Sequence, residues 1–364
     1  MASASIPDLQ APPKKGRFWR LVKRVLIGIV LLLVGAGLAG AAYQAIANWR
    51  DARRFPQEGR SIALGAKFAG VSLNLNCMGQ GSPTVILDSG LGVPAAGWDL
   101  VMPDVAKFAR VCSYDRAGYG WSSAGPMPRT SDEIVEELHA LLAASGERGP
   151  YVLVAHSFGG YNVRIYADKY PAEVTGLVLV DTSHEDQNQL MPPSLKKLTN
   201  EQIAQLDSQR RLMPILIFFG IARITAGDDG DNKLSKDFRE KMNYLQLQTK
   251  FIEAAFSEIK SFSQSADEVR RTGNLGDRPL VVLTAGKDLE AKDLPKGISA
   301  EDMREFRKTW VNDLQVRQAK LSTRGKQIVV PDSTHMIPME RPDAVVNAIR
   351  EVSDAVKAGS GPKS

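Results

Sequence analysis

Six short apolar runs, rich in β-branched residues, constrain the fold of this 364-residue chain more than any other feature. Each run is apolar at consecutive positions, whereas a strand with one solvated face alternates apolar and polar residues. Continuous runs predict strands buried on both faces, and therefore a mostly parallel sheet with helices on both sides. The runs are Thr84–Asp88, Val111–Asp115, Tyr151–His156, Leu177–Asp181, Leu280–Thr284 and Ile328–Val330. The expected fold class is α/β.

Helical patterns lie between these runs, and one interval is long enough for an extra layer. Capping signals predict helices over about 131–144 and about 342–357. Strand signals stop over 186–272, where long amphipathic patterns predict a helical insertion. We therefore expect a core of residues 60–185 and 273–357, a helical cap over 186–272, and a disordered tail over 358–364.

Residues 25–47 form an uncharged apolar stretch near the start of the chain. About 20 helical residues cross a bilayer core of about 30 Å, and signal peptides have shorter apolar regions, so a retained transmembrane anchor is expected. Six Lys or Arg precede the stretch and three, offset by Asp51, follow it closely. The positive-inside rule then predicts a cytoplasmic basic tail over 1–24 and an extracytoplasmic domain. Because Ala39–Ala41 resembles a cleavage site, a signal peptide is the alternative, and the protein would then be secreted or periplasmic.

The charge of the chain is distributed unevenly, which bears on its partners. The net charge is +5, but residues 1–60 contain ten basic and three acidic side chains. Residues 61–364 contain 36 basic and 38 acidic side chains, a net charge of −2. Binding to nucleic acid therefore loses its electrostatic basis, and a small molecule and a membrane remain as expected partners.

The segment Ala155-His156-Ser157-Phe158-Gly159 stands where a strand run ends and a helical pattern begins. A serine in such an abrupt turn adopts a strained backbone conformation, which small residues two positions away allow. Its hydroxyl then projects at a helix N-terminus, where backbone N–H groups stabilise developing negative charge. Serine is also a common helix cap, but the strand before it and the helix after it predict that Ser157 is a nucleophile.

Four motifs follow one another along residues 60–357 with a characteristic order and spacing. They are Asp88-Ser89-Gly90-Leu91-Gly92, Asp115-Arg116-Ala117-Gly118-Tyr119-Gly120-Trp121-Ser122, the turn at Ser157, and Ser333-Thr334-His335. In these motifs the chain resembles the α/β-hydrolase superfamily, and within it the capped esterases and prolyl iminopeptidases. Two residues depart from the commonest pattern: Ala155 replaces a glycine, and Ser89 stands where histidine often precedes the oxyanion glycine.

The superfamily places its catalytic residues in the order nucleophile, acid, histidine. This order selects His335 as the general base, with His184 in reserve. The resemblance implies an acid at Asp288, shortly after the run Leu280–Thr284, and Asp181 at the tip of the preceding run is the alternative. The other histidines, His139 and His156, are expected to pack in the fold or to point away from the nucleophile.

Two backbone N–H groups complete the expected site as an oxyanion hole. By resemblance they belong to Phe158 and Leu91, and glycines on both sides of Leu91 let that loop approach a ligand closely. Asp115 and Arg116 are expected to brace the fold. No metal or other cofactor is expected, because the histidines and cysteines lack ligand spacing and no phosphate-binding loop follows the first strand run.

Together these residues predict a membrane-anchored serine hydrolase that cleaves a carboxylic ester through an acyl-enzyme. One alternative is a prolyl-iminopeptidase-like aminopeptidase, whose substrate amine the acidic cluster Asp228-Asp229-Gly230-Asp231 could bind. Another is a protein that keeps the triad yet only binds a ligand. Epoxide hydrolase and haloalkane dehalogenase chemistry is disfavoured, because those relatives carry aspartate where this chain has Ser157.

The most apolar stretch outside the anchor is residues 212–224, within the helical insertion. Its residues Phe218 and Phe219 could line an acyl-binding pocket or dip into the membrane surface. A buried helix that packs the cap onto the core is the third possibility, because apolar helical stripes commonly belong to a core.

Cys77 and Cys112 are the only cysteines in the chain. Cys77 ends an alternating run over 71–77, and Cys112 lies at the start of the run Val111–Asp115. In the fold that the chain resembles, these two strands are antiparallel neighbours. Because an extracytoplasmic domain permits disulfides, we predict a Cys77–Cys112 disulfide, with two buried thiols as the alternative.

Overall fold

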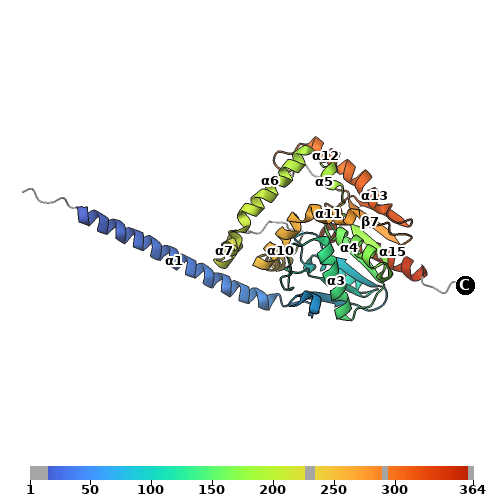
Figure 1. Ribbon diagram of the computed structural model, residues 1–364, viewed down its shortest axis with the longest axis horizontal. Coiled ribbons are helices and arrows are strands. Elements are labelled where there is room, and N and C mark those ends of the chain that lie inside the picture. Colours follow the sequence, from blue (N-terminus) through green and yellow to red (C-terminus); the bar gives the residue numbers. More distant parts are fainter. Residues whose placement is uncertain (1–14, 226–233, 289–293, 360–364) are drawn as a thin grey trace, which may run out of the picture.

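A computed structural model describes residues 15–225, 234–288 and 294–359 and has an eight-stranded sheet at its centre (Figure 1). The strand order is β1-β2-β4-β3-β5-β6-β7-β8. β2 is antiparallel to both of its neighbours, β1 and β4, and the remaining pairs are parallel. The strands are β1 (Arg60–Ala63), β2 (Ser72–Met78), β3 (Thr84–Asp88), β4 (Val111–Tyr114), β5 (Tyr151–His156), β6 (Val174–Val180), β7 (Leu280–Ala285) and β8 (Gly325–Val330). Each of the six predicted runs is a strand.

Buried side chains alternate between the two faces of this sheet. Leu153 and Ala155 of β5 pack in one core layer, and Val152 and Val154 pack in the other. The first layer is covered by α3 (Ser131–Ser145), α4 (Gly159–Lys169) and α11 (Phe262–Arg270), and the second by α2 (Met102–Val105) and α15 (Pro342–Gly359). Cover on both faces explains why the strand sequences are continuously apolar.

Helices also fill the connections at the carboxyl ends of β6 and β7. β6 leads into α5 (Gln187–Leu190), α6 (Pro193–Arg210), α7 (Met213–Phe218), α8 (Ile221–Thr225), α9 (Lys236–Gln246), α10 (Thr249–Lys260) and α11. A helix that the sequence analysis did not predict joins β7 to β8, and it consists of α12 (Ala300–Thr309), a π-helical turn (Trp310–Leu314) and α13 (Gln315–Ala319). The last helices of the described residues are α14 (Ile337–Glu340) and α15. Short 3-10 turns are Ala66–Phe68, Ala95–Trp98 and Pro171–Glu173.

The N-terminal helix α1 (Lys15–Arg54) has 40 residues and projects away from the core (Figure 1). At 1.5 Å per residue its length is about 60 Å. Its apolar part is long enough to cross a membrane by length and composition, and its most apolar window is not buried. An anchor and a signal sequence both fit this description. The C-terminal half of α1 lies beside α7 and α9.

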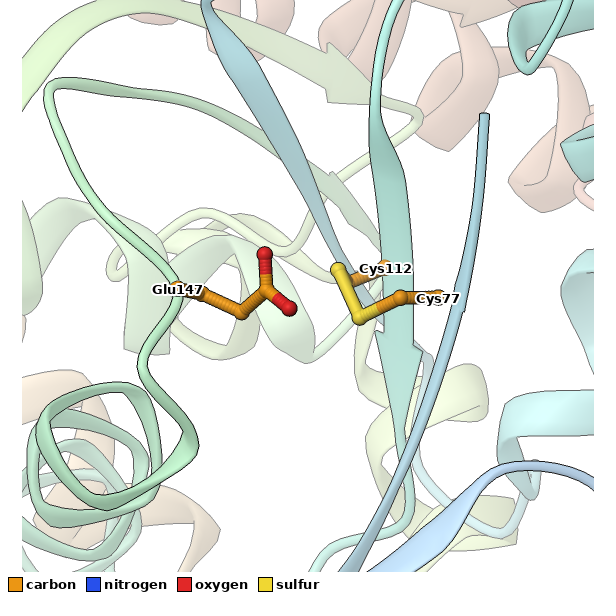
Figure 2. Close-up of side chains that lie close together, drawn as sticks. All are labelled: Cys77, Cys112 and Glu147. Carbon is orange, nitrogen blue, oxygen red and sulfur yellow. A yellow bond between two sulfur atoms is a disulfide. The ribbon is translucent and has the colours of Figure 1, made fainter. Parts of the chain in front are cut away.

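Cys77 and Cys112 face each other across β2 and β4 and are joined by a disulfide (Figure 2). Their Cα atoms lie 4.1 Å apart. The structure therefore joins the pair that the sequence analysis selected. The Glu147 carboxylate lies beside the sulfur atoms, but sulfurs in a disulfide offer no thiolate to a metal. Glu147 instead forms a two-pronged ion pair with Arg110, with both N–O distances at 2.6 Å.

Candidate active site

Ser157 lies in the turn that joins β5 to α4, at the carboxyl edge of the parallel strands. Its φ is +53°, in the left-handed region that side chains larger than glycine rarely adopt. The turn leaves no room for side chains nearby. A Cβ added to Gly159 would lie 2.8 Å from the Asp88 carbonyl oxygen, and one added to Gly160 would lie 2.4 Å from the Thr182 Cβ. The small residues around the serine thus permit the strained turn.

His335 lies in the loop between β8 and α14, and its Nε2 is 2.9 Å from the Ser157 Oγ. The loop is held by the Glu340 carboxylate, which accepts hydrogen bonds from the Thr334 backbone N–H (2.6 Å) and the Ser333 hydroxyl (3.1 Å). The structure therefore brings together the two residues that the sequence analysis assigned as nucleophile and base.

Asp181 follows β6 directly, and its carboxylate accepts a hydrogen bond from the other ring nitrogen of His335. The distance from His335 Nδ1 to Asp181 Oδ2 is 2.6 Å. The second oxygen, Oδ1, accepts from the Trp310 Nε1–H and from the Ala285 backbone N–H, both at 2.9 Å. Burial by itself raises the pKa of Asp181, but the interaction with His335 and these two hydrogen bonds hold that pKa below its ordinary value. An ionised Asp181 fixes the proton on Nδ1 and leaves Nε2 free to accept the serine proton.

The assignment of Asp288 as the acid is wrong. Its carboxylate is 84% exposed and pairs with Arg307 at 2.9 Å. Asp181 is instead anchored to the end of β7 through the Ala285 amide, so it occupies the place beside His335. The order nucleophile, acid, histidine fits both aspartates, and only the three-dimensional structure separates them.

His156 precedes the nucleophile, and its side chain supports the base. Its Nε2 is 2.8 Å from the backbone carbonyl oxygen of His335. A carbonyl oxygen only accepts, so this nitrogen carries the proton. Burial, with a smaller contribution from the nearby His335, lowers the pKa of His156 to about 3. His156 is therefore neutral at physiological pH and fixes the loop that carries His335.

The remaining two histidines lie outside this hydrogen-bonded chain. His184, the reserve base, is buried, and its Nδ1 accepts from the Asp186 backbone N–H at 3.0 Å. Its burial lowers its pKa. His139 stacks on Tyr170 with ring centroids 3.8 Å apart. Both have structural contacts that account for their positions.

The two backbone N–H groups of the expected oxyanion hole lie in turns beside the nucleophile. Within the described residues, the backbone N–H groups of Leu91 and Phe158 donate to no other residue. Gly90 lies against the serine, because a Cβ added there would be 3.1 Å from the Ser157 Cβ and 2.9 Å from His156 Nδ1. Two amides that face no internal acceptor are thus available to a ligand beside the nucleophile.

Arg116 holds the loop that carries Leu91. This buried side chain donates to the carbonyl oxygens of Ser89 (2.7 Å) and Gly90 (2.9 Å). Its charge is balanced by Asp88 and by Glu258 of α10, each at 2.9 Å. The sequence analysis expected Arg116 to brace the fold, and the structure shows that it ties the loop of the expected oxyanion hole to a helix of the insertion.

One cavity borders the serine, and a second cavity shares part of its wall. The first has a volume of about 510 Å³ and is lined by Ser157, Asp181 and His335 together with Met303, Phe306 and Trp310. The second has a volume of about 480 Å³, and its apolar walls are Leu91, Ile203, Leu206, Ile259 and Phe262. Gln187 and Met191 line both cavities. Volumes of this size suit a small organic ligand.

Phe218 and Phe219 line neither of these two cavities. Phe218 is 62% exposed, so the stretch is not a wholly buried packing helix. Phe219 lies against Gly37 and Gly40 of α1. The structure therefore removes these residues from the pocket and places them beside the candidate membrane helix.

Comparisons with known proteins agree with this architecture. A model of the alpha/beta hydrolase family matches residues 85–348. Two uncharacterized Bacillus subtilis proteins are each 26% identical to this chain. The match to YqjL covers 75% of this chain and 85% of YqjL, and the match to YbdG covers 45% of this chain and 50% of YbdG. A thermophilic esterase from Thermogutta terrifontis superposes with a TM-score of 0.54 at 23% identity, over 82% of this chain and 98% of the esterase. A mutant epoxide hydrolase from Bacillus megaterium superposes with a TM-score of 0.59 at 16% identity, over 81% of this chain and 100% of the epoxide hydrolase. The family model spans most of the chain, and the chain belongs to the alpha/beta hydrolase family.

Proposed function

We propose that this hydrolase is a membrane-anchored serine esterase that forms an acyl-enzyme on Ser157. The observation that carries the proposal is the unbroken hydrogen-bonded chain from Ser157 through His335 to Asp181, with distances of 2.9 and 2.6 Å. This arrangement supplies a nucleophile, a base and a group that orients the base.

The geometry supports acylation by a simple proton transfer. Ser157 Oγ attacks the ester carbonyl carbon while its proton moves to His335 Nε2. Asp181 stabilises the resulting imidazolium without taking its proton. The carbonyl oxygen becomes negative and accepts from the N–H groups of Leu91 and Phe158. His335 then gives the proton to the departing alkoxide, and the C–O bond breaks.

Deacylation uses the same groups with water in place of the serine. A water molecule gives a proton to His335 Nε2 and attacks the acyl carbon. Collapse of the second tetrahedral intermediate returns that proton to Ser157 Oγ and releases a carboxylic acid. His335 accepts and returns the proton in both halves of the cycle.

We also propose that α1 is a retained anchor, with its basic N-terminal end in the cytoplasm and the catalytic domain outside. This proposal rests on the charge difference across residues 25–47 and on the length of the helix. The contacts of α1 with α7 and α9 support retention, because a cleaved leader would leave the mature protein and its contacts would be lost.

The aminopeptidase alternative depends on the acidic cluster Asp228-Asp229-Gly230-Asp231, which lies outside the described residues. The ligand-binding alternative predicts the same pocket without turnover. Activity measurements separate both alternatives from the esterase.

The test is hydrolysis of 4-nitrophenyl acetate by the full-length protein in detergent. Ser157→Ala and His335→Ala should each lower kcat by about 10³-fold or more, and the double variant should be little worse than either. Ser208→Ala, on the surface of α6, is the matched control and should retain full activity. Hydrolysis of amino-acyl anilides but not of esters would favour the aminopeptidase, and undiminished activity in Ser157→Ala would refute the mechanism.

A further inference from the structure

Five large apolar side chains are exposed along α7, α8 and their flanking residues. They are Leu212, Ile215, Phe218, Ile221 and Ile224, with exposed fractions between 43 and 67%. We call this set the α7–α8 ridge. Soluble domains rarely expose so continuous an apolar surface unless something covers it.

The α7–α8 ridge is fixed to the apolar part of α1. A Cβ added to Gly37 would lie 3.2 Å from the Phe219 ring, and one added to Gly40 would lie 2.4 Å from the Phe219 carbonyl oxygen. A Cβ added to Gly220 would lie 2.8 Å from the Tyr43 ring. Small residues allow backbones to approach this closely, as they do where helices pack inside membranes. Figure 1 shows α7 lying beside α1 at this level.

The position of these contacts along α1 sets their depth. Gly37 and Gly40 lie ten and seven residues before Ala47, the end of the uncharged stretch. At 1.5 Å per residue, Phe219 would therefore sit about 10–15 Å below the surface of a membrane that α1 crosses. Interfacial helices bury their apolar face to about 5–10 Å, so this depth is within the acyl-chain layer.

Polar contacts between the same elements occur only toward the outer end of α1 among the described residues. Arg223 of α8 binds Gln44 (3.2 Å), Asn48 (2.9 Å) and Asp51 (2.5 Å). These partners lie near and beyond the end of the uncharged stretch, at the level of the lipid headgroups. The interface is thus apolar where acyl chains would surround it and charged where water would.

The α7–α8 ridge also connects to the second cavity. Helix α6 provides Ile203 and Leu206 to the cavity wall and ends at Arg210, two residues before the ridge begins at Leu212. Leu206 is itself 45% exposed, so the cavity wall includes an apolar side chain at the surface of the helix that leads to the ridge. The wall of the same cavity also includes Leu91 of the expected oxyanion hole.

We propose that the α7–α8 ridge is inserted in the outer leaflet of the bilayer that α1 crosses, and that the second cavity receives the acyl chain of a lipid ester from that leaflet. The occupant of the ridge is lipid. The choice of a long-chain ester as substrate class rests on the proposed esterase function, whereas the membrane contact does not.

Photocrosslinking tests the membrane contact without requiring activity. The full-length protein is placed in phosphatidylcholine vesicles with p-benzoylphenylalanine in place of Phe218. The control carries it in place of Val329, an exposed residue of the edge strand β8. Lipid adducts at position 218 and none at 329 are expected. Adducts between two protein copies, or no lipid adduct at 218, would overturn the proposed insertion.

Kinetics test the route of the substrate. Ile215→Ser with Phe218→Ser should leave hydrolysis of soluble 4-nitrophenyl acetate unchanged and lower hydrolysis of vesicle-borne 4-nitrophenyl palmitate by about tenfold or more, because the apolar contact with lipid is lost. Ile328→Ser with Val329→Ser, on exposed residues of β8, is the matched control and should alter neither rate. Equal losses on both esters would overturn entry from the leaflet. Lipid adducts with no hydrolysis of either ester by the unmodified protein would refute the esterase proposal and support the membrane contact.

Discussion

Asp181 forms three hydrogen bonds, from His335, Trp310 and the Ala285 amide, and Asp288 forms none of these. Replacement of Asp181 by asparagine keeps the side-chain shape but presents an amide that no longer favours the required imidazole tautomer. Asp181→Asn should therefore lower kcat by about 10³–10⁴-fold. Asp288→Asn, the matched control, should change kcat by less than about twofold, since its carboxylate is solvated. A severe loss in Asp288→Asn with an active Asp181→Asn would reverse the assignment.

His156 should make the protein sensitive to acid. Its pKa is about 3 in the folded protein and about 6.5 in an unfolded chain, so the unfolded state binds the proton first as the pH falls. The free energy of unfolding should decrease by about 1.4 kcal/mol per pH unit as the pH falls below about 6.5. This loss of stability should end near pH 3.

His156→Gln provides the comparison, because a glutamine amide can still donate to the His335 carbonyl oxygen. Denaturant unfolding at pH 7 and pH 4.5 should show a difference between wild type and variant that changes by about 2–3 kcal/mol. Identical pH dependence of the two proteins would show that His156 is not buried in its neutral form.

The site was predictable where a residue is fixed by local sequence and ambiguous where it is fixed by distant contacts. Ser157 was identified from the abrupt change between a strand run and a helix, and His335 from its place after the last run. The acid was not, because the hydrogen bonds that position Asp181 come from β7 and from Trp310, 129 residues further along the chain.

At the scale of elements, six of the strands follow from apolar runs that need cover on both faces, whereas their order in the sheet was not predicted. The helix α12 was missed although a signal was present: the Ser299 side chain caps it by accepting from the Asp302 N–H at 3.0 Å. This helix matters to the site, because it leads to Trp310 and its Met303 and Phe306 line the first cavity. The strand β1 was also missed, since its residues are mostly exposed and show no apolar pattern.

The disulfide between β2 and β4 should stabilise the edge of the sheet. It closes a segment with a sequence separation of 35 residues, so its contribution is about 2–4 kcal/mol. A thiol reductant should lower the Tm of the wild-type protein by about 5–10 °C. The same reductant should not change the Tm of the double variant that carries Cys77→Ala and Cys112→Ala. An equal response of the two proteins, or alkylatable thiols in protein from native membranes, would contradict the bond.

At the scale of the whole molecule, the long helix and the hydrolase core were each predicted from the sequence, but the contact between them was not. Their contact joins Gly37 and Gly40 to Phe219, nearly half the chain away. Glycines in an apolar helix fit equally well with an anchor that packs against nothing. The attachment gives the core a fixed position relative to α1, and thereby to any membrane that α1 crosses.

The central claim is that this hydrolase has an activated serine at position 157. The most direct test is labelling of the full-length protein with a fluorophosphonate, followed by peptide mapping. The structure predicts one modified residue, Ser157, with labelling abolished in Ser157→Ala and greatly slowed in His335→Ala, because the serine then lacks its base. Labelling of a different serine, or none in the folded protein, would contradict the account.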